Sequence, residues 1–175
     1  MNSLSIFFTY EYISSKVDIT WEDLKFGIDH GFLSSNAAIK HATKLAAENP
    51  NVSNLMFGLA SLYPGDSIQQ YLDQLVKSES VTEQNELAAE KWLYLTLYWL
   101  YENKEKFPDP LTQVEEIYAD FDYPESISKF VSYMPLEEDE GPLPPTREVA
   151  ISNIYKNWVD YLVSQNRRFM KKHKR

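Results

Sequence analysis

The candidate residues for catalysis or binding gather around one stretch, Tyr118–Glu125, which reads Tyr-Ala-Asp-Phe-Asp-Tyr-Pro-Glu. Five carboxylates gather in and just before this stretch, in Glu115, Glu116, Asp120, Asp122 and Glu125. A glycosidase-like or divalent-metal site needs only two or three converging carboxylates. In an acidic protein such a grouping is more often a solvated face. A carboxylate-based or metal-dependent hydrolytic enzyme is therefore kept as the alternative function.

The same stretch interleaves acidic residues with aromatic rings ahead of Pro124. Rigid aromatic side chains beside carboxylates suit recognition of an Arg or Lys side chain, through charge-assisted hydrogen bonds and cation–π contact. The residues predicted to bind a partner are Tyr118, Asp120, Asp122, Tyr123 and Glu125. The competing interpretation is that the aromatic residues face the core while the acids help to turn the chain. The sequence leaves both interpretations open.

Other chemical signatures are missing from the sequence. There is no cysteine, and the three histidines, His30, His41 and His173, form no paired or HExxH pattern. No GxSxG, P-loop or GxGxxG segment occurs either. We therefore predict no catalytic residue, no metal ligand and no cofactor.

The net charge of −9 is unevenly distributed along the chain. Residues 1–145 carry 9 Lys and Arg against 24 Asp and Glu, whereas residues 146–175 carry 8 against 2. The acidic body disfavours nucleic acid and suits a basic protein partner. The basic end, residues 167–175, alone resembles an RNA-binding tail, but cations that complement a helix C-terminus explain it more simply.

The chain shows no targeting or membrane signal. Its first residues lack a basic region and reach Glu11 too early for a signal peptide. The longest apolar run, Trp92–Tyr101, is about half of what a membrane span needs. We expect a cytoplasmic protein; its oligomeric state is not indicated.

The secondary structure that holds these residues is predicted to be helical. A length of 175 residues suits one domain, and only 5 glycines argue against an all-β fold. We expect a single domain over residues 1–175, all-α, as a compact bundle of about seven to eight helices. Repeated short helices joined by Pro-containing turns leave a short α-solenoid-like stack as the alternative.

Local signals place several of these helices. Thr20 and Asp23 resemble a capping box, and Gly31 lies where a glycine ends a helix. The strongest element runs from about Thr82 to Lys106; its centre is apolar all round, as in a helix at the core of a bundle. Asp109 and Thr146 are predicted N-caps of later helices.

Three segments are less regular. Leu4–Ile13 fits a helix face and also a strand, and helix is favoured because no partner strand is visible. A short helix is expected over residues 126–134. The Pro-rich acidic segment 135–145 is predicted to be a loop.

Several of these segments together resemble a bacterial family known as domain of unknown function 2247. They are Thr20–Leu24 with Gly27 and Gly31, Ala37–Ala42, Lys91–Leu93 leading to Trp99–Asn103, and Tyr118–Glu125. The last is the most specific. The resemblance implies a small cytosolic bacterial protein and supplies no catalytic residues. Small acidic helical proteins of this kind often serve as immunity partners that occlude a toxin, an association by class. We therefore expect a non-enzymatic protein-binding module, such as an immunity protein against a toxin, with a basic partner.

Overall fold

The computed structural model describes residues 1–79, 84–134 and 141–170. Those residues form eight α-helices and two 3-10 helices, with no β-strand among them, so the predicted all-α class is confirmed. In chain order the elements are α1 (Tyr10–Lys16), α2 (Trp21–Asp29), α3 (Asn36–Glu48), α4 (Asn54–Ala60), α5 (Gln69–Ser78), α6 (Gln84–Glu102), η1 (Lys104–Lys106), α7 (Pro110–Asp120), η2 (Glu125–Phe130) and α8 (Arg147–Phe169). In the described part of the chain, no helix has the length and apolarity that crossing a membrane requires.

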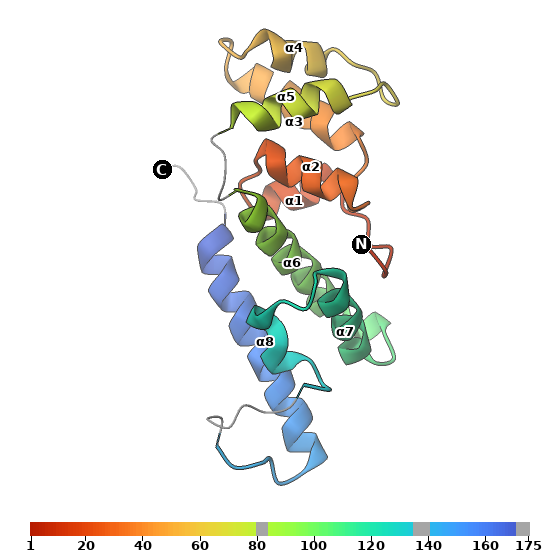
Figure 1. The fold of residues 1–175 in the computed structure, drawn as a ribbon, viewed down its shortest axis with the longest axis vertical. Coiled ribbons are helices and arrows are strands. Elements are labelled where there is room, and N and C mark those ends of the chain that lie inside the picture. The colour runs from red at the N-terminus through yellow and green to blue at the C-terminus, as the bar shows by residue number, and fades with distance from the viewer. Residues whose placement is uncertain (80–83, 135–140, 171–175) are drawn as a thin grey trace. The chain divides into compact units, whose positions relative to one another are not determined.

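The chain divides into two compact units, and the boundary falls within α6, between Trp92 and Leu93. The N-terminal unit holds Leu4–Trp92 with Asn2, and the C-terminal unit holds Leu93–Met170 with Met1 and Ser3. In the first, α4 packs on α3 and α5, and α2 packs on the same two helices (Figure 1). In the second, η2 packs on α8. The single-domain organisation stays a prediction.

Helix-start signals in the sequence are confirmed by the backbone. At α2, the Thr20 amide donates to Asp23 Oδ2 at 2.8 Å and the Asp23 amide donates to Thr20 Oγ1 at 3.1 Å, which completes the capping box. Asp109 caps α7 ahead of a proline at the first helical position, and Thr146 caps α8. After α2, Gly31 has a φ of 76°, the left-handed conformation that favours glycine.

The predicted apolar helix is α6, and its centre is core. Trp92 through Leu97 and Leu100 are buried, while Tyr98, Trp99 and Tyr101 are half-buried. The described helix begins at Gln84; the predicted start near Thr82 lies outside the described residues. A helix that is apolar all round therefore takes its stability from the packing around it rather than from one amphipathic face.

Two predicted helices are wrong in part. In Leu4–Ile13 the helix begins only at Tyr10, because Ile6 and Phe8 are buried and Phe7 is exposed, a period of two that suits an extended chain. The amide of Phe8 donates to the carbonyl of Phe32 at 2.8 Å. Over 126–134 the structure has the 3-10 helix η2, which ends at Phe130. Residues 135–140 of the predicted acidic loop and 171–175 of the basic end lie outside the described residues.

Candidate functional site

The predicted site begins where α7 ends. The Tyr123 amide donates to the Tyr118 carbonyl at 2.8 Å, and the Asp122 amide donates to the Ala119 carbonyl at 3.2 Å. These two bonds form a Schellman motif, which satisfies the last carbonyls of the helix. The motif usually places glycine at the position of Asp122. Here Asp122 and Tyr123 have φ values of 58° and 57°, so two consecutive side-chain-bearing residues are held in the left-handed region.

This backbone separates the predicted residues into buried and exposed groups. Tyr118 is only 5% exposed, whereas Tyr123 is 61% exposed, and Asp122 and Glu125 are exposed as well. Asp120 is half-buried, and its carboxylate accepts hydrogen bonds from the Ser3 amide and hydroxyl at 2.7 and 2.6 Å. Tyr118 therefore lies beneath the surface, and both carboxylate oxygens of Asp120 already accept hydrogen bonds from Ser3.

Sequence reasoning missed one member of this site, Tyr133, which is 55% exposed. The rings of Tyr123 and Tyr133 both pack on Tyr118, with centroid separations of 5.3 and 6.3 Å. The Tyr118 hydroxyl in turn contacts the sulfur of Met134 at 3.9 Å. Tyr133 follows η2, and no local pattern in the sequence indicates that η2 returns the chain to the end of α7.

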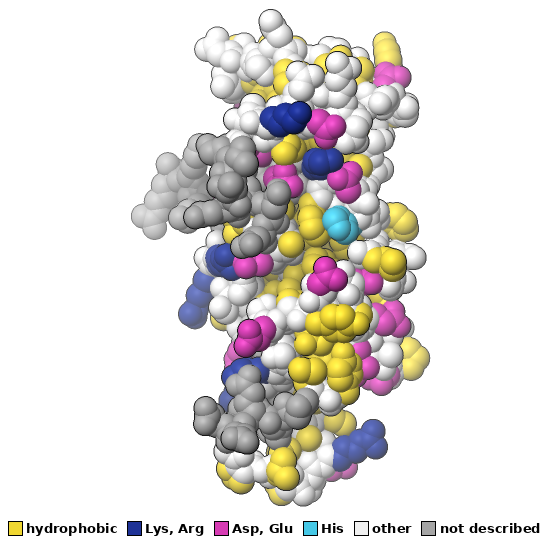
Figure 2. Space-filling view, in the orientation of Figure 1, with side chains coloured by type: hydrophobic (Ala, Val, Ile, Leu, Met, Phe, Trp, Pro, Cys, Tyr) yellow, Lys and Arg dark blue, Asp and Glu magenta, His cyan; other side chains and the backbone are white. Residues whose placement is uncertain are grey.

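A carboxylate, that of Glu115, lies near these rings. Ser132 Oγ donates a hydrogen bond to Glu115 Oε1, which fixes the carboxylate next to the tyrosines. The pKa of Tyr133 is raised by desolvation first and then by the nearby Tyr118, Tyr123 and Glu115. We call exposed Asp122, Tyr123, Glu125 and Tyr133 the acid–aromatic surface. Figure 2 shows hydrophobic side chains with acidic ones around them over the part of the molecule that holds α7.

The metal-dependent form of the alternative function needs several carboxylates to converge. Within residues 1–79, 84–134 and 141–170, no three or more His, Cys, Asp or Glu side chains are placed to hold a metal ion together. Glu115 is bonded to Ser132, and Asp120 is bonded to Ser3. The two carboxylates thus serve contacts within the fold.

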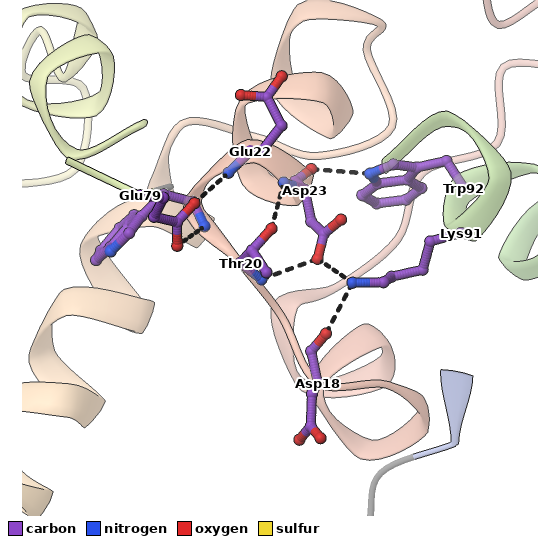
Figure 3. A network of polar contacts seen from close by, with 8 residues as sticks. Asp18, Thr20, Glu22, Asp23, Glu79, Lys91 and Trp92 are labelled. Atoms are coloured by element: carbon purple, nitrogen blue, oxygen red, sulfur yellow. Dashed lines mark hydrogen bonds and ion pairs between the residues drawn. The ribbon is translucent and has the colours of Figure 1, made fainter. Parts of the chain in front are cut away.

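A second polar cluster lies in the N-terminal unit and joins α2 to α6 (Figure 3). Lys91 Nζ donates to Asp23 Oδ2 at 2.5 Å and to the Asp18 carbonyl at 3.0 Å. The Trp92 indole nitrogen donates to the Asp23 carbonyl at 2.8 Å. Lys91 and Asp23 are 6% and 4% exposed. A substrate cannot reach a pair so deeply buried. The Lys91–Asp23 pair therefore contributes to the stability of the fold.

Glu79 belongs to the same cluster and caps α2 from a distance. Its two carboxylate oxygens accept from the Trp21 and Glu22 amides at 3.0 and 3.2 Å (Figure 3). A carboxylate at a helix N-terminus meets unsatisfied amides and the positive end of the helix dipole. Burial nevertheless raises the pKa of Glu79, and those two amide bonds partly offset the rise. Sequence reasoning missed this cap because Glu79 lies 58 residues from Trp21 in the chain.

Beside this cluster, His41 lies among aromatic side chains. The Tyr10 hydroxyl and His41 Nδ1 are 2.9 Å apart, and the Trp21 ring contacts the imidazole edge-on at a centroid separation of 4.8 Å. His41 is 8% exposed, and burial lowers its pKa to about 4, with a smaller contribution from Lys44. It is therefore a neutral core histidine at pH 7.

The C-terminal unit also contains a groove of about 360 Å³. Tyr98 and Tyr101 line it from α6, and Leu162 and Val163 line it from α8. Lys104 lies 4.2 Å from the centre of the Tyr101 ring. The groove results from the packing of two helices distant in sequence, so no local motif predicts it.

The sequence pattern of the family described as "Uncharacterized protein conserved in bacteria (DUF2247)" matches residues 10–166. The chain belongs to this family. Neither a curated protein nor a solved structure matches the chain. The DUF2247 match includes residues of both compact units and confirms the resemblance seen in the sequence.

Three of the segments that carry the DUF2247 resemblance belong to the buried cluster or to the acid–aromatic surface. Thr20–Leu24 and Lys91–Leu93 contribute Asp23, Lys91 and Trp92 to the buried cluster. The Trp92 ring also packs against Gly27, where an added Cβ would lie 2.3 Å from it. Tyr118–Glu125 forms the turn that carries most of the acid–aromatic surface. Thr20–Leu24 and Lys91–Leu93 thus hold the fold, and Tyr118–Glu125 presents side chains to solvent.

Proposed function

We propose that this DUF2247 protein is a non-enzymatic protein-binding module whose acid–aromatic surface covers a basic partner. An immunity protein that occludes a toxin is the specific form of the proposal. The observation that carries it is the exposure of Tyr123 and Tyr133, 61% and 55%, whose rings both pack on the buried Tyr118. Large aromatic rings held rigid at a surface are typical anchors of protein interfaces.

The local charge supports a basic partner. Residues 110–134 carry five Asp and Glu against the single Lys129. Of these acids, Asp122 and Glu125 are exposed beside the aromatic rings. A surface of one sign steers an oppositely charged partner and raises the rate of association, while the aromatic contacts set how long the complex lasts.

The backbone of the turn also supports recognition. Left-handed conformations at residues other than glycine cost free energy, and they concentrate at functional sites. Here they direct Tyr123 outward while its amide still caps α7. A glycine at residue 122 would form the turn with less strain but would lack the carboxylate.

The experiment is capture of partners by the tagged protein from cells that naturally produce it, at low and at high salt. Wild type is compared with Tyr123→Ser and with Tyr63→Ser, a matched change at a tyrosine that is 77% exposed in the N-terminal unit. We expect a basic protein that wild type and Tyr63→Ser retain and Tyr123→Ser loses, with weaker capture at high salt. Recovery of no partner at either salt, or equal capture by Tyr123→Ser, contradicts the proposal.

A further inference from the structure

The tyrosine rings of the acid–aromatic surface are arranged around a common support. Tyr123 meets Tyr118 edge to face at an interplanar angle of 85°, and Tyr133 meets it at 58°. Tyr123 precedes η2 in the chain and Tyr133 follows it, and each ring keeps more than half of its area exposed. The buried ring of Tyr118 supports both of them.

A carboxylate adjoins the rings. Glu115 lies on α7 one helical turn before Tyr118, and the hydrogen bond from Ser132 holds it on the side of Tyr133. The influence of Tyr123 and Glu115 on the pKa of Tyr133 is consistent with the closeness of these groups. Electron-rich ring faces together with a fixed carboxylate form an environment that attracts a cation.

We infer that Tyr123 and Tyr133, supported by Tyr118 and flanked by Glu115, form a receptor for the guanidinium group of one arginine side chain on a partner protein. A guanidinium is planar and weakly hydrated, so it stacks on aromatic faces while its N–H groups bond a carboxylate. The five acids against one lysine in residues 110–134 supply the charge complementarity. The inference rests on the proposed function and names the chemical group that the surface selects.

The test uses methylguanidinium chloride as the probe, and methylurea as a neutral compound of similar shape. Ring signals of isotopically labelled tyrosines are followed by NMR and assigned with Tyr123→Phe and Tyr133→Phe. Sodium chloride at equal ionic strength is the blank. We expect saturable shifts of the Tyr123 and Tyr133 signals with methylguanidinium only. The affinity should fall about threefold in Tyr123→Leu and in Tyr133→Leu, and stay within twofold of wild type in the two Phe variants, which keep the ring face.

Equal shifts with methylurea, or shifts no larger than those with sodium chloride, overturn the inference. So does unchanged affinity in both Leu variants, whose folding is checked by circular dichroism. The result is distinguishable from failure of the proposed function. If a partner is captured through Tyr123 but methylguanidinium does not bind, the module stands and the arginine receptor falls. If methylguanidinium binds but no partner depends on Tyr123, the affinity of the rings for a guanidinium stands, while the proposed function and the assignment to a partner protein fall.

Discussion

Replacing Lys91 by Met tests how strongly the buried Lys91–Asp23 pair holds α6 to α2. The change keeps the aliphatic stem and removes the ammonium that donates to Asp23 Oδ2 at 2.5 Å and to the Asp18 carbonyl at 3.0 Å. It leaves the Asp23 carboxylate buried, with only the Thr20 amide still donating to Oδ2 among the bonds of Figure 3. Removal of one partner of a buried ion pair costs about 3–5 kcal/mol of unfolding free energy.

The protein offers a matched control at Lys25 on α2, the helix that carries Asp23. Lys25 pairs with Asp29 at 2.9 Å and with Asp73 at 3.3 Å, but its side chain is 28% exposed and its partners are over 40% exposed. Solvent screens such pairs, so Lys25→Met should cost no more than about 1 kcal/mol. The double variant Asp23→Asn with Lys91→Met should be more stable than Lys91→Met alone, because no uncompensated charge stays buried.

The assay is urea unfolding at pH 7, followed by circular dichroism and tryptophan fluorescence, with midpoints and slopes compared. We expect Lys91→Met to lower the midpoint far more than Lys25→Met, with the double variant between them. If Lys91→Met and Lys25→Met have equal effects, or if the double variant is the least stable of the set, the assigned role of the buried pair is refuted.

Three further predictions concern single positions. Gly27→Ala places a Cβ 2.3 Å from the Trp92 ring, so it should lower the unfolding free energy by at least about 1 kcal/mol despite the helix preference of alanine. The loss should appear as a lower thermal midpoint, and an unchanged midpoint would contradict this packing. The pKa of His41 is about 4 in the folded state, against the usual 6.5 of a solvated histidine, so the unfolded state binds the proton more readily. Stability should therefore be full above pH 6.5 and fall by up to about 3 kcal/mol as the pH drops towards 4, and His41→Gln should flatten this dependence in urea titrations at each pH. Asp122→Gly should relieve the strain of the positive φ of 58° and raise the unfolding free energy by about 0.5–1 kcal/mol. A lower unfolding free energy would show that the turn needs the aspartate.

The sequence predicts the fold best where one short segment decides the outcome. The capping box at Thr20, the proline-led start of α7 and the glycine at 31 depend on neighbours within three residues, and all three are confirmed. Helix was favoured over strand for Leu4–Ile13, and this was wrong for residues 4–9, which precede α1. Its burial pattern depends on a contact with Phe32, which no local window contains.

The candidate site was predictable in composition but not in geometry. The interleaving of acids and aromatic residues marks Tyr118–Glu125 as unusual, yet only the left-handed turn decides that Tyr118 is buried and Tyr123 exposed. Tyr133 and Glu79 were missed for one reason, since each reaches its place through contacts between residues far apart in the sequence.

The central claim is that the acid–aromatic surface binds a protein. The most direct measurement replaces Tyr123 by a photo-crosslinking phenylalanine analogue in cells that naturally produce the protein, with the same replacement at Tyr63 as the control. Both tyrosines are well exposed, at 61% and 77%. The account predicts a discrete crosslinked protein from position 123, attached through a segment that contains arginine, and none from position 63. The same products from both positions, or none from position 123, would contradict it.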